Sequence, residues 1–212
     1  MNRLITFEGV DGCGKSTQLK LAAQWLRGRG EQVVTAFEPG DTSLGKEIRT
    51  LLLAGEFVPV AEAELLMFLA DRAQHVREKI QPALDSGAWV LCDRYTDSTL
   101  AYQLAARKLA EGAANLKDML RFAECGVSPQ LTLWFDVSVT VAMQRMKKRA
   151  EAGEKATRLD DEAASFHQRV AEAFGHQFEF NSGRITRIDA EKDINGVFAQ
   201  VEQALEAHFS LS

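Results

Sequence analysis

The sequence predicts an α/β fold: a three-layer sandwich in which a five-stranded parallel sheet lies between two layers of helices. Along the 212 residues, short apolar runs alternate with longer stretches of helical periodicity. Strands that are separated by helices form βαβ units, and these units build parallel sheets. One apolar run, residues 89–92, has no polar alternation, which is typical of a strand buried on both faces. Because no repeat and no linker divides the chain, we expect a single domain over residues 1–212.

The predicted elements follow one another regularly. Residues 18–29 and 61–84 have helical periodicity, and residues 194–209 are expected to form a closing helix. Gly30 follows the first of these helices, whereas Pro82 is expected to kink or restart the second. Ligands bind at the carboxyl ends of the strands in such sheets, so the chemistry should lie in the loops there. The five predicted strands are residues 4–7, 32–37, 89–92, 131–135 and 184–188.

Composition excludes several classes of protein. The formal net charge is −5, whereas a nucleic-acid-binding surface is basic, so we expect no nucleic-acid partner. No apolar run is long enough to span a bilayer, and the N-terminus has the pattern of neither a signal nor a transit peptide. We therefore expect no membrane partner and a cytoplasmic location. Three cysteines without a CxxC pair argue against a disulfide framework or a zinc site.

A phosphate-binding loop follows the first predicted strand. Residues 9–16 read GVDGCGKS and match the motif G-x-x-x-x-G-K-[ST] in full. The glycines let backbone N–H groups point at phosphate oxygens, and the N-terminal end of the next helix adds positive charge. Lys15 is expected to reach the outer phosphates of ATP, and Ser16 is expected to ligate Mg²⁺. The predicted nucleotide-binding residues are Gly9, Gly12, Gly14, Lys15, Ser16 and Thr17.

The third predicted strand ends in a charged pair. Asp93 is placed like a Walker-B carboxylate, so it is predicted to act on Mg²⁺ together with Ser16. Arg94, the next residue, is suited to binding a second anionic group with two of its nitrogens. The alternative for this dipeptide is an ion pair that caps a helix.

Four short motifs lie in order along nearly the whole chain. They are Phe7-Glu8-Gly9, Glu38-Pro39-Gly40, Asp93-Arg94-Tyr95 and Ser98-x-x-x-Tyr102-Gln103. Together they resemble the bacterial thymidylate kinases, and residues 93–103 carry the closest likeness. The chain departs from that family in having Phe37 where arginine is common, and Gly40-Asp41-Thr42 where Gly-Gly-Thr is common.

The resemblance implies a P-loop NTPase-type fold and a kinase that phosphorylates dTMP to dTDP with ATP and Mg²⁺, in dTTP biosynthesis. That family is usually dimeric, so a homodimer is expected. The acceptor would be a phosphate, which is largely deprotonated at neutral pH, so no general base is needed. The site must instead bring two anions together. Lys15, Arg49, Arg94 and the basic run near Arg149 are the cations expected to converge there.

The resemblance also implies how the acceptor is held. Phe68 would stack on thymine, and Arg72, one helical turn later, would donate to a base carbonyl. Ser98 and Gln103 would lie at the base, and Tyr102 beside the sugar, where it leaves no room for a 2′-hydroxyl. The residues alone also allow Phe68 to be core and Arg72 to be solvated. The predicted acceptor-binding residues are Asp11, Glu38, Pro39, Arg49, Phe68, Arg72, Arg94, Ser98, Tyr102 and Gln103.

A charged segment at residues 145–160 is predicted to be a lid that closes over ATP. Some members of the resembled family carry arginine directly after the loop aspartate, where this chain has Gly12, and members without it supply arginine from the lid. Arg149 and Arg158 are therefore predicted to be catalytic, with Lys15 and Arg94. The alternative is a solvated helix end, because most charge runs are solvated.

Three other functions compete with this one. A deoxynucleoside kinase would need a general base for a neutral hydroxyl, and Glu38 follows the second strand, where such a base is typical. A regulatory GTPase would carry an Asn-Lys-x-Asp motif, which the sequence lacks. A plain nucleotide-binding module would leave the converging arginines without a use.

Overall fold

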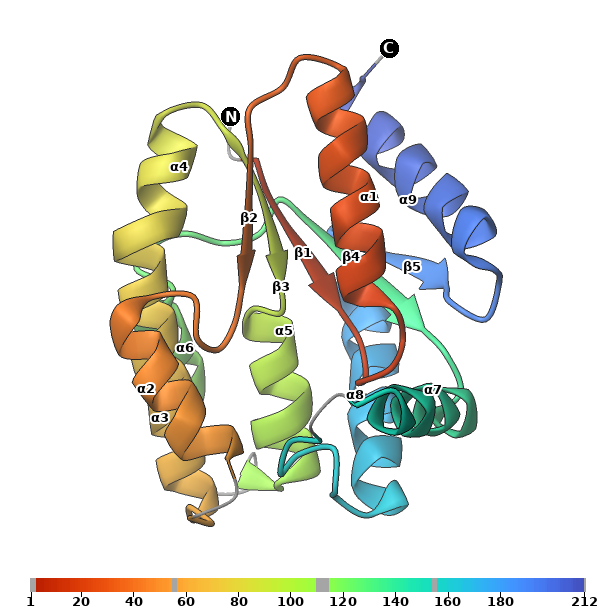
Figure 1. Cartoon of the computed structure of the whole chain (residues 1–212). Helices are drawn as coiled ribbons and strands as arrows, with labels where there is room; N and C mark the ends of the chain where they lie inside the picture. The colour runs from red at the N-terminus through yellow and green to blue at the C-terminus, as the bar shows by residue number, and fades with distance from the viewer. Residues whose placement is uncertain (1–2, 55–56, 110–114, 154–155, 212) are drawn as a thin grey trace.

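The computed structural model describes residues 3–54, 57–109, 115–153 and 156–211. A parallel five-stranded sheet lies at its centre, with the strand order β2–β3–β1–β4–β5 (Figure 1). The register places Phe7 beside Asp93 on one side and beside Leu133 on the other. The predicted α/β fold is confirmed, and each strand begins within one residue of its expected start. The strands are β1 (Leu4–Glu8), β2 (Val33–Phe37), β3 (Trp89–Asp93), β4 (Leu131–Asp136) and β5 (Ile185–Asp189).

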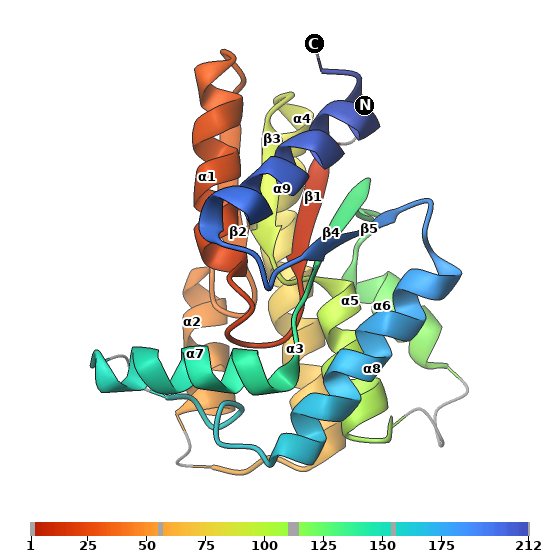
Figure 2. The ribbon, with the colours of Figure 1, turned by 90° about the vertical axis from the view of Figure 1, so that its right-hand side faces the viewer.

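Helices cover both faces of the sheet, which explains its continuous apolar strands. Helices α1 (Lys15–Gly28) and α9 (Ile194–Phe209) lie on one face, and α8 (Ala164–Phe180) lies on the other (Figure 2). Every residue of β1 is buried. The rings of Phe7 and Phe135 stack between β1 and β4 with their centroids 5.7 Å apart, and burial of such rings stabilises the core.

The remaining helices surround the carboxyl ends of the strands or connect one strand to the next. Helices α2 (Ser43–Leu53), α3 (Ala61–His75) and α7 (Val139–Glu151) lie at the end of the molecule toward which the strands point (Figure 1). They therefore enclose the place where the sequence predicts the chemistry. The shorter helices are α4 (Gln81–Asp85), α5 (Thr96–Thr99) and α6 (Leu116–Ala123).

Helix α2 has no counterpart among the predicted elements. It begins after Thr42, whose hydroxyl oxygen accepts a hydrogen bond from the Gly45 N–H at 2.9 Å and so caps the helix. Ile48 and Leu52, one turn apart, are buried, and the helix packs on α3. A helix this short is marginal by itself, so its packing partner decides that it forms. Helix α6 is likewise a short element that the sequence pattern does not mark.

Two predicted helices have different limits in the structure. Helix α1 begins at Lys15, three residues early, because Gly14 takes a left-handed conformation (φ 99°) that leads directly from loop to helix. The stretch predicted over 61–84 is interrupted by a π-helical turn at Val76–Ile80, after which Pro82 lies in the first turn of α4. The backbone stays helical through this turn, and the Gln81 N–H donates to the Val76 carbonyl oxygen, so Pro82 follows a widened turn within one continuous helical stretch.

The three cysteines act as small packing or loop side chains. Cys13 and Cys92 are buried and Cys125 is half-buried, all three as free thiols. Over the described ranges, no helix is both long enough and apolar enough to cross a bilayer.

Candidate functional site

A cavity of about 1020 Å³ lies at the carboxyl ends of the strands. Four predicted cations from separate segments, Lys15, Arg49, Arg94 and Arg149, line it together. A chain with a net charge of −5 therefore concentrates positive charge at one place, as an anion site requires. The other predicted residues on its wall are Asp11, Gly12, Gly14, Ser16, Thr17, Glu38, Pro39, Phe68, Arg72, Asp93, Ser98, Tyr102 and Gln103.

The phosphate loop joins β1 to α1 and is packed against α7. Gly12 has a φ of 82°, and a Cβ at this position would overlap the carbonyl oxygen of Ala142, so no side chain fits while α7 keeps its place. Lys15 is only 6% exposed and donates from Nζ to the carbonyl oxygens of Gly9 (3.1 Å) and Val10 (3.0 Å). Its ammonium group is thereby held at the loop, within reach of a bound phosphate.

Ser16 and Asp93 form a pair of oxygen ligands beside the loop. The Ser16 hydroxyl donates to Asp93 Oδ2 at 2.6 Å, and both residues line the cavity. Mg²⁺ in kinases is bound by one or two such side-chain oxygens together with substrate phosphates. The pair therefore fits the predicted metal ion.

Arg94 bridges the phosphate loop and the segment after β3. Its backbone is left-handed (φ 71°), a conformation that is uncommon outside glycine and is concentrated at functional sites. Nη2 donates to Asp11 Oδ1 at 2.6 Å and to the Tyr102 hydroxyl at 3.1 Å, and Nη1 donates to Ser98 Oγ at 2.9 Å. Its ion pair thus reaches across to the loop and does not serve as a helix cap.

Asp11 stays ionised in this arrangement. The Tyr102 hydroxyl donates to Asp11 Oδ2 at 2.8 Å. Burial opposes the charge of Asp11, but the positive charges of Arg94 and Lys15 outweigh it and hold the pKa of Asp11 well below its usual range. An ionised carboxylate on the cavity wall is a ready acceptor for a hydroxyl of a bound ligand.

Arg72 is fixed in a buried network on another wall of the cavity. It is 2% exposed, so it is not the solvated side chain of the alternative interpretation. Its Nε donates to Glu38 Oε2 at 2.9 Å, and Nη1 donates to Thr99 Oγ1 at 2.9 Å. His75 Nδ1 lies 2.9 Å from Glu38 Oε1. Burial acts against charging His75, but its bonds to Glu38 and the charge of Asp41 raise its pKa.

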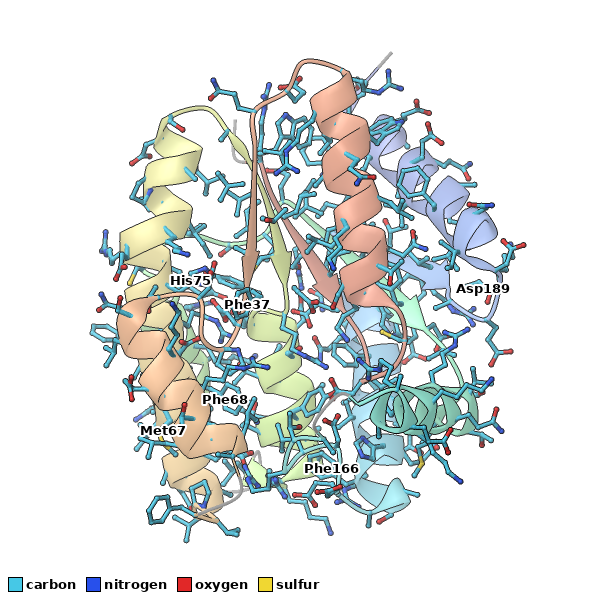
Figure 3. All side chains as sticks on the ribbon, in the orientation of Figure 1. Phe37, Met67, Phe68, His75, Phe166 and Asp189 are labelled. Carbon is cyan, nitrogen blue, oxygen red and sulfur yellow. The ribbon has the colours of Figure 1, made fainter. Side chains whose placement is uncertain are left out.

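Two aromatic rings lie beside this network. Phe68 and Phe37 both line the cavity. Phe37 and His75 lie near the carboxyl end of β2, and Phe68 lies beyond them in the direction in which β2 points (Figure 3). Phe68 is half-buried and faces the cavity rather than the core. The Arg49 guanidinium lies 5.9 Å from the centre of the Phe37 ring and donates to the Pro39 carbonyl oxygen at 2.7 Å. Aromatic and cationic surface are therefore next to each other, as recognition of a nucleotide base and its phosphate requires.

Glu64, in the first turn of α3, accepts hydrogen bonds from side chains of two other segments of the chain. Arg107 donates from Nε to Oε1 and from Nη2 to Oε2, both at 3.2 Å. Gln103 Nε2 donates to Oε1 at 3.1 Å, and Arg158 Nη2 donates to Oε2 at 2.5 Å. Burial raises the pKa of this carboxyl, but the hydrogen bonds from Arg107, Gln103 and Arg158 outweigh burial, so that the pKa is lowered.

The two predicted lid arginines lie in different places. Arg149, near the end of α7, is on the cavity wall. Arg158 is bound to Glu64 and donates from Nε to the Leu52 carbonyl oxygen at 3.1 Å, and it is not part of the wall that the described residues form. Residues 154–155 of the predicted lid lie outside the described residues.

The motifs do not mark Glu64 and His75, although both belong to networks at the cavity. Helical spacing offers a signal for each. Glu64, Phe68 and Arg72 recur at intervals of four residues and so share one face of α3, and His75 follows Arg72 by three. A search of that face for partners of the predicted base-binding residues would have found them.

Glu8 is a buried carboxyl at the end of β1. It accepts hydrogen bonds from the Tyr95 N–H at 2.7 Å and from Ser98 Oγ at 2.5 Å. Burial, and next the negative charge of Asp97, raise its pKa from 4.5 to about 8. Between those two values the folded state binds a proton that the unfolded chain has lost, so this group destabilises the fold as pH rises through that window.

We expect the glutamine variant to remove this dependence. In Glu8→Gln the group at this position no longer titrates, so the fall in melting temperature between about pH 5 and pH 8 should be smaller than in the wild type. Thermal unfolding followed by circular dichroism measures both slopes. Glu47→Gln, at an exposed position of α2, is the control and should keep the wild-type slope. Equal slopes in wild type and Glu8→Gln would contradict the raised pKa.

Comparison with known proteins places the chain in one family. The family model of thymidylate kinase matches residues 7–201. The thymidylate kinases of Nostoc punctiforme and Carboxydothermus hydrogenoformans are 41% and 43% identical to it, over 97% and 96% of this chain and 96% and 97% of their own lengths. The crystal structure of thymidylate kinase from Ehrlichia chaffeensis matches with a TM-score of 0.76 and 31% identity, over 97% of this chain and 98% of that one. The chain therefore belongs to the thymidylate kinase family.

Proposed function

We propose that the chain binds ATP and dTMP in the 1020 Å³ cavity and joins them through the residues that line it. The reaction itself, phosphorylation of dTMP to dTDP, follows from membership of the family. The convergence of Lys15, Arg49, Arg94 and Arg149 on one cavity carries the proposal. Two anionic substrates repel each other, so a site that brings their phosphates together needs this much positive charge.

The phosphate loop forms the donor side. Lys15 exchanges the carbonyl oxygens of Gly9 and Val10 for the outer phosphates of ATP. Ser16 and Asp93 would hold Mg²⁺, which neutralises phosphate charge when it is bound. The end of α1 nearest the loop adds its positive dipole.

The Arg72 network forms the acceptor side. Phe68 stacks on the thymine ring, and Arg72 donates to a base carbonyl while Glu38 holds its guanidinium in place. Both oxygens of Glu38 are already engaged, Oε2 by Arg72 and Oε1 by His75, so Glu38 is poorly placed to serve as a general base. A phosphate acceptor needs no base, which favours dTMP over a nucleoside.

The sugar and phosphate of dTMP would lie between these two sides. Arg94 and Arg49 bind the acceptor phosphate, and Asp11, which is ionised, accepts a hydrogen bond from the 3′-hydroxyl. Ser98 keeps Arg94 in position through the 2.9 Å bond to Nη1. The acceptor phosphate is thereby brought toward the donor loop.

Tyr102 is expected to select deoxyribose. Its hydroxyl is held between Asp11 (2.8 Å) and Arg94 (3.1 Å), so the ring cannot turn away from the sugar. Tyr102→Ala should narrow the gap in kcat/KM between dTMP and its ribose analogue by roughly tenfold or more, because the space for a 2′-hydroxyl opens. Tyr102→Phe keeps the ring and should keep the selectivity. Steady-state kinetics with both substrates measures it, and an unchanged gap in Tyr102→Ala would exclude the steric role.

A substrate panel tests the proposed function as a whole. ADP release from ATP is measured with each nucleoside monophosphate in turn, and with thymidine. Transfer to dTMP but not to thymidine is expected. Transfer to thymidine would instead support a deoxynucleoside kinase. ATP hydrolysis without any acceptor would support a regulatory switch that binds and hydrolyses nucleotide.

We also propose that the chain is a homodimer and works in the cytoplasm, which agrees with the metabolic reaction of the family. A groove of about 550 Å³ between α3 and α6 has an apolar wall that includes Leu66, Met119 and Phe122. Leu66 and Phe122 are 54% and 83% exposed, and exposed apolar patches commonly mark protein interfaces. Light scattering should give twice the chain mass of 23.5 kDa.

A further inference from the structure

The side-chain amide of Gln103 can recognise two different kinds of base. If its carbonyl oxygen faces the ligand, it accepts from the N3–H group of a pyrimidine-2,4-dione such as thymine. If its NH₂ group faces the ligand, it donates to the N3 atom of cytosine, which carries no hydrogen. A site built for one hydrogen-bond pattern rejects the other strongly. The orientation of this amide therefore affects which base is bound.

We infer that Glu64 is a positioning residue that turns the Gln103 carbonyl oxygen toward the base and so favours a 2,4-dione over cytosine; this rests on dTMP being the acceptor. Gln103 Nε2 donates to Glu64 Oε1 at 3.1 Å, and the two residues are 2% and 1% exposed. An ionised carboxylate accepts hydrogen bonds and donates none. Gln103 must therefore give Glu64 its NH₂ group, which leaves Oε1 for the cavity that Gln103 lines.

Two guanidinium groups keep Glu64 ionised. Arg107 donates to both carboxylate oxygens, and Arg158 donates to Oε2. The same contacts outweigh burial and lower the pKa of Glu64. Near neutral pH the carboxyl group consequently has no proton to offer, and the amide of Gln103 has a single favourable orientation.

The isosteric variant Glu64→Gln should reverse this orientation. The new carbonyl oxygen should take the place of Oε2, because Arg107 Nη2 and Arg158 Nη2 both donate there. This placement leaves one guanidinium donor, Arg107 Nε, without its acceptor at Oε1, whereas the opposite placement would leave two. The new NH₂ group then takes the place of Oε1 and faces Gln103, which must turn its own oxygen away from the base. The ratio of kcat/KM for dTMP to kcat/KM for dCMP should fall about tenfold or more.

Two matched variants separate positioning from a structural role. Arg107→Lys removes the two-point partner of Glu64 but keeps a positive charge beside it, so the carboxylate stays ionised and the ratio should stay near its wild-type value. In the background of Gln103→Ala, adding Glu64→Gln should change the ratio no further. If Glu64 only held the protein together, its replacement would lower the activity with both nucleotides equally.

The experiment measures both nucleotides with wild type, the single variants and the double variant, after melting curves have shown that each folds. Two results would overturn the inference. One is an unchanged ratio in folded Glu64→Gln. The other is that Glu64→Gln lowers the ratio as much in the Gln103→Ala background as in the wild-type background. If Glu64→Gln does not fold, Glu64→Asp takes its place, because the shorter side chain withdraws the carboxylate from Gln103. Glu64→Asp should lower the same ratio. A wild-type protein that fails to phosphorylate dTMP would refute the proposed function itself, whatever the variants do.

Discussion

Replacing Lys15 with alanine is expected to lower kcat by about 10²–10³-fold or more, as for other donors aimed at developing charge. The ammonium group is 6% exposed and already lies at the loop, held by the carbonyl oxygens of Gly9 and Val10. Negative charge on the transferred phosphoryl group would lose this preorganised partner, and water cannot replace it at the same geometry. Turnover at saturating ATP and dTMP, followed by ADP release, is the measurement.

A second lysine provides the control for this experiment. Lys46 is exposed on α2 and lies off the cavity wall, so Lys46→Ala should turn over normally. Circular dichroism shows whether each variant is folded. A folded Lys15→Ala protein with near-normal kcat would mean that the loop only binds ATP and that the catalytic charge lies elsewhere.

Removing both lid arginines should lower kcat by about 10³-fold or more while the KM for dTMP stays nearly the same. An arginine that meets the phosphoryl group only when the lid is closed stabilises the transition state more than the ground state. Arg149 lines the cavity, whereas Arg158 is engaged by Glu64 and the Leu52 carbonyl oxygen. We therefore expect Arg149→Ala alone to account for most of the loss of kcat.

The comparison uses Arg149→Ala, Arg158→Ala and the double variant, with saturating ATP. Lys147→Ala, at an exposed position of the same helix and off the cavity wall, is the matched control for a change of charge. A double variant that keeps most of its turnover would show that residues 145–160 are only a charged segment. The missing cation would then have to come from Arg49, Arg94 or another residue.

The strands and the phosphate loop could be predicted because their signals are local. Residues 89–92 are apolar without alternation, and they form a strand that is buried on both faces. The eight residues from Gly9 to Ser16 are sufficient to predict the phosphate loop, because its geometry depends on glycines at fixed positions in the motif. The motifs Glu38-Pro39-Gly40 and Asp93-Arg94-Tyr95 lie at strand ends, and the strand ends of a parallel sheet meet at one edge. Phe68 and Arg72 reach the same wall from helix α3.

The partners of those residues could not be predicted, because they come from distant parts of the chain. Arg94 and Asp11 are 83 positions apart, and Arg158 and Glu64 are 94 apart. No local pattern reports such pairs. Helix α2 was not predicted for a related reason. It is stabilised by its packing against α3 rather than by the helix propensity of its own residues.

The packing of α7 against Gly12 has an evolutionary consequence. An arginine in place of Gly12 would not fit in this chain while α7 keeps its position, since even a Cβ at position 12 would overlap the Ala142 carbonyl oxygen. Moving the cation from lid to loop therefore requires a mutation at position 12 together with a shift of the whole helix. A lineage making only one of these changes would pass through a clashing or underpowered enzyme. Each branch of the family should consequently retain its own arrangement, and intermediates between them should be rare.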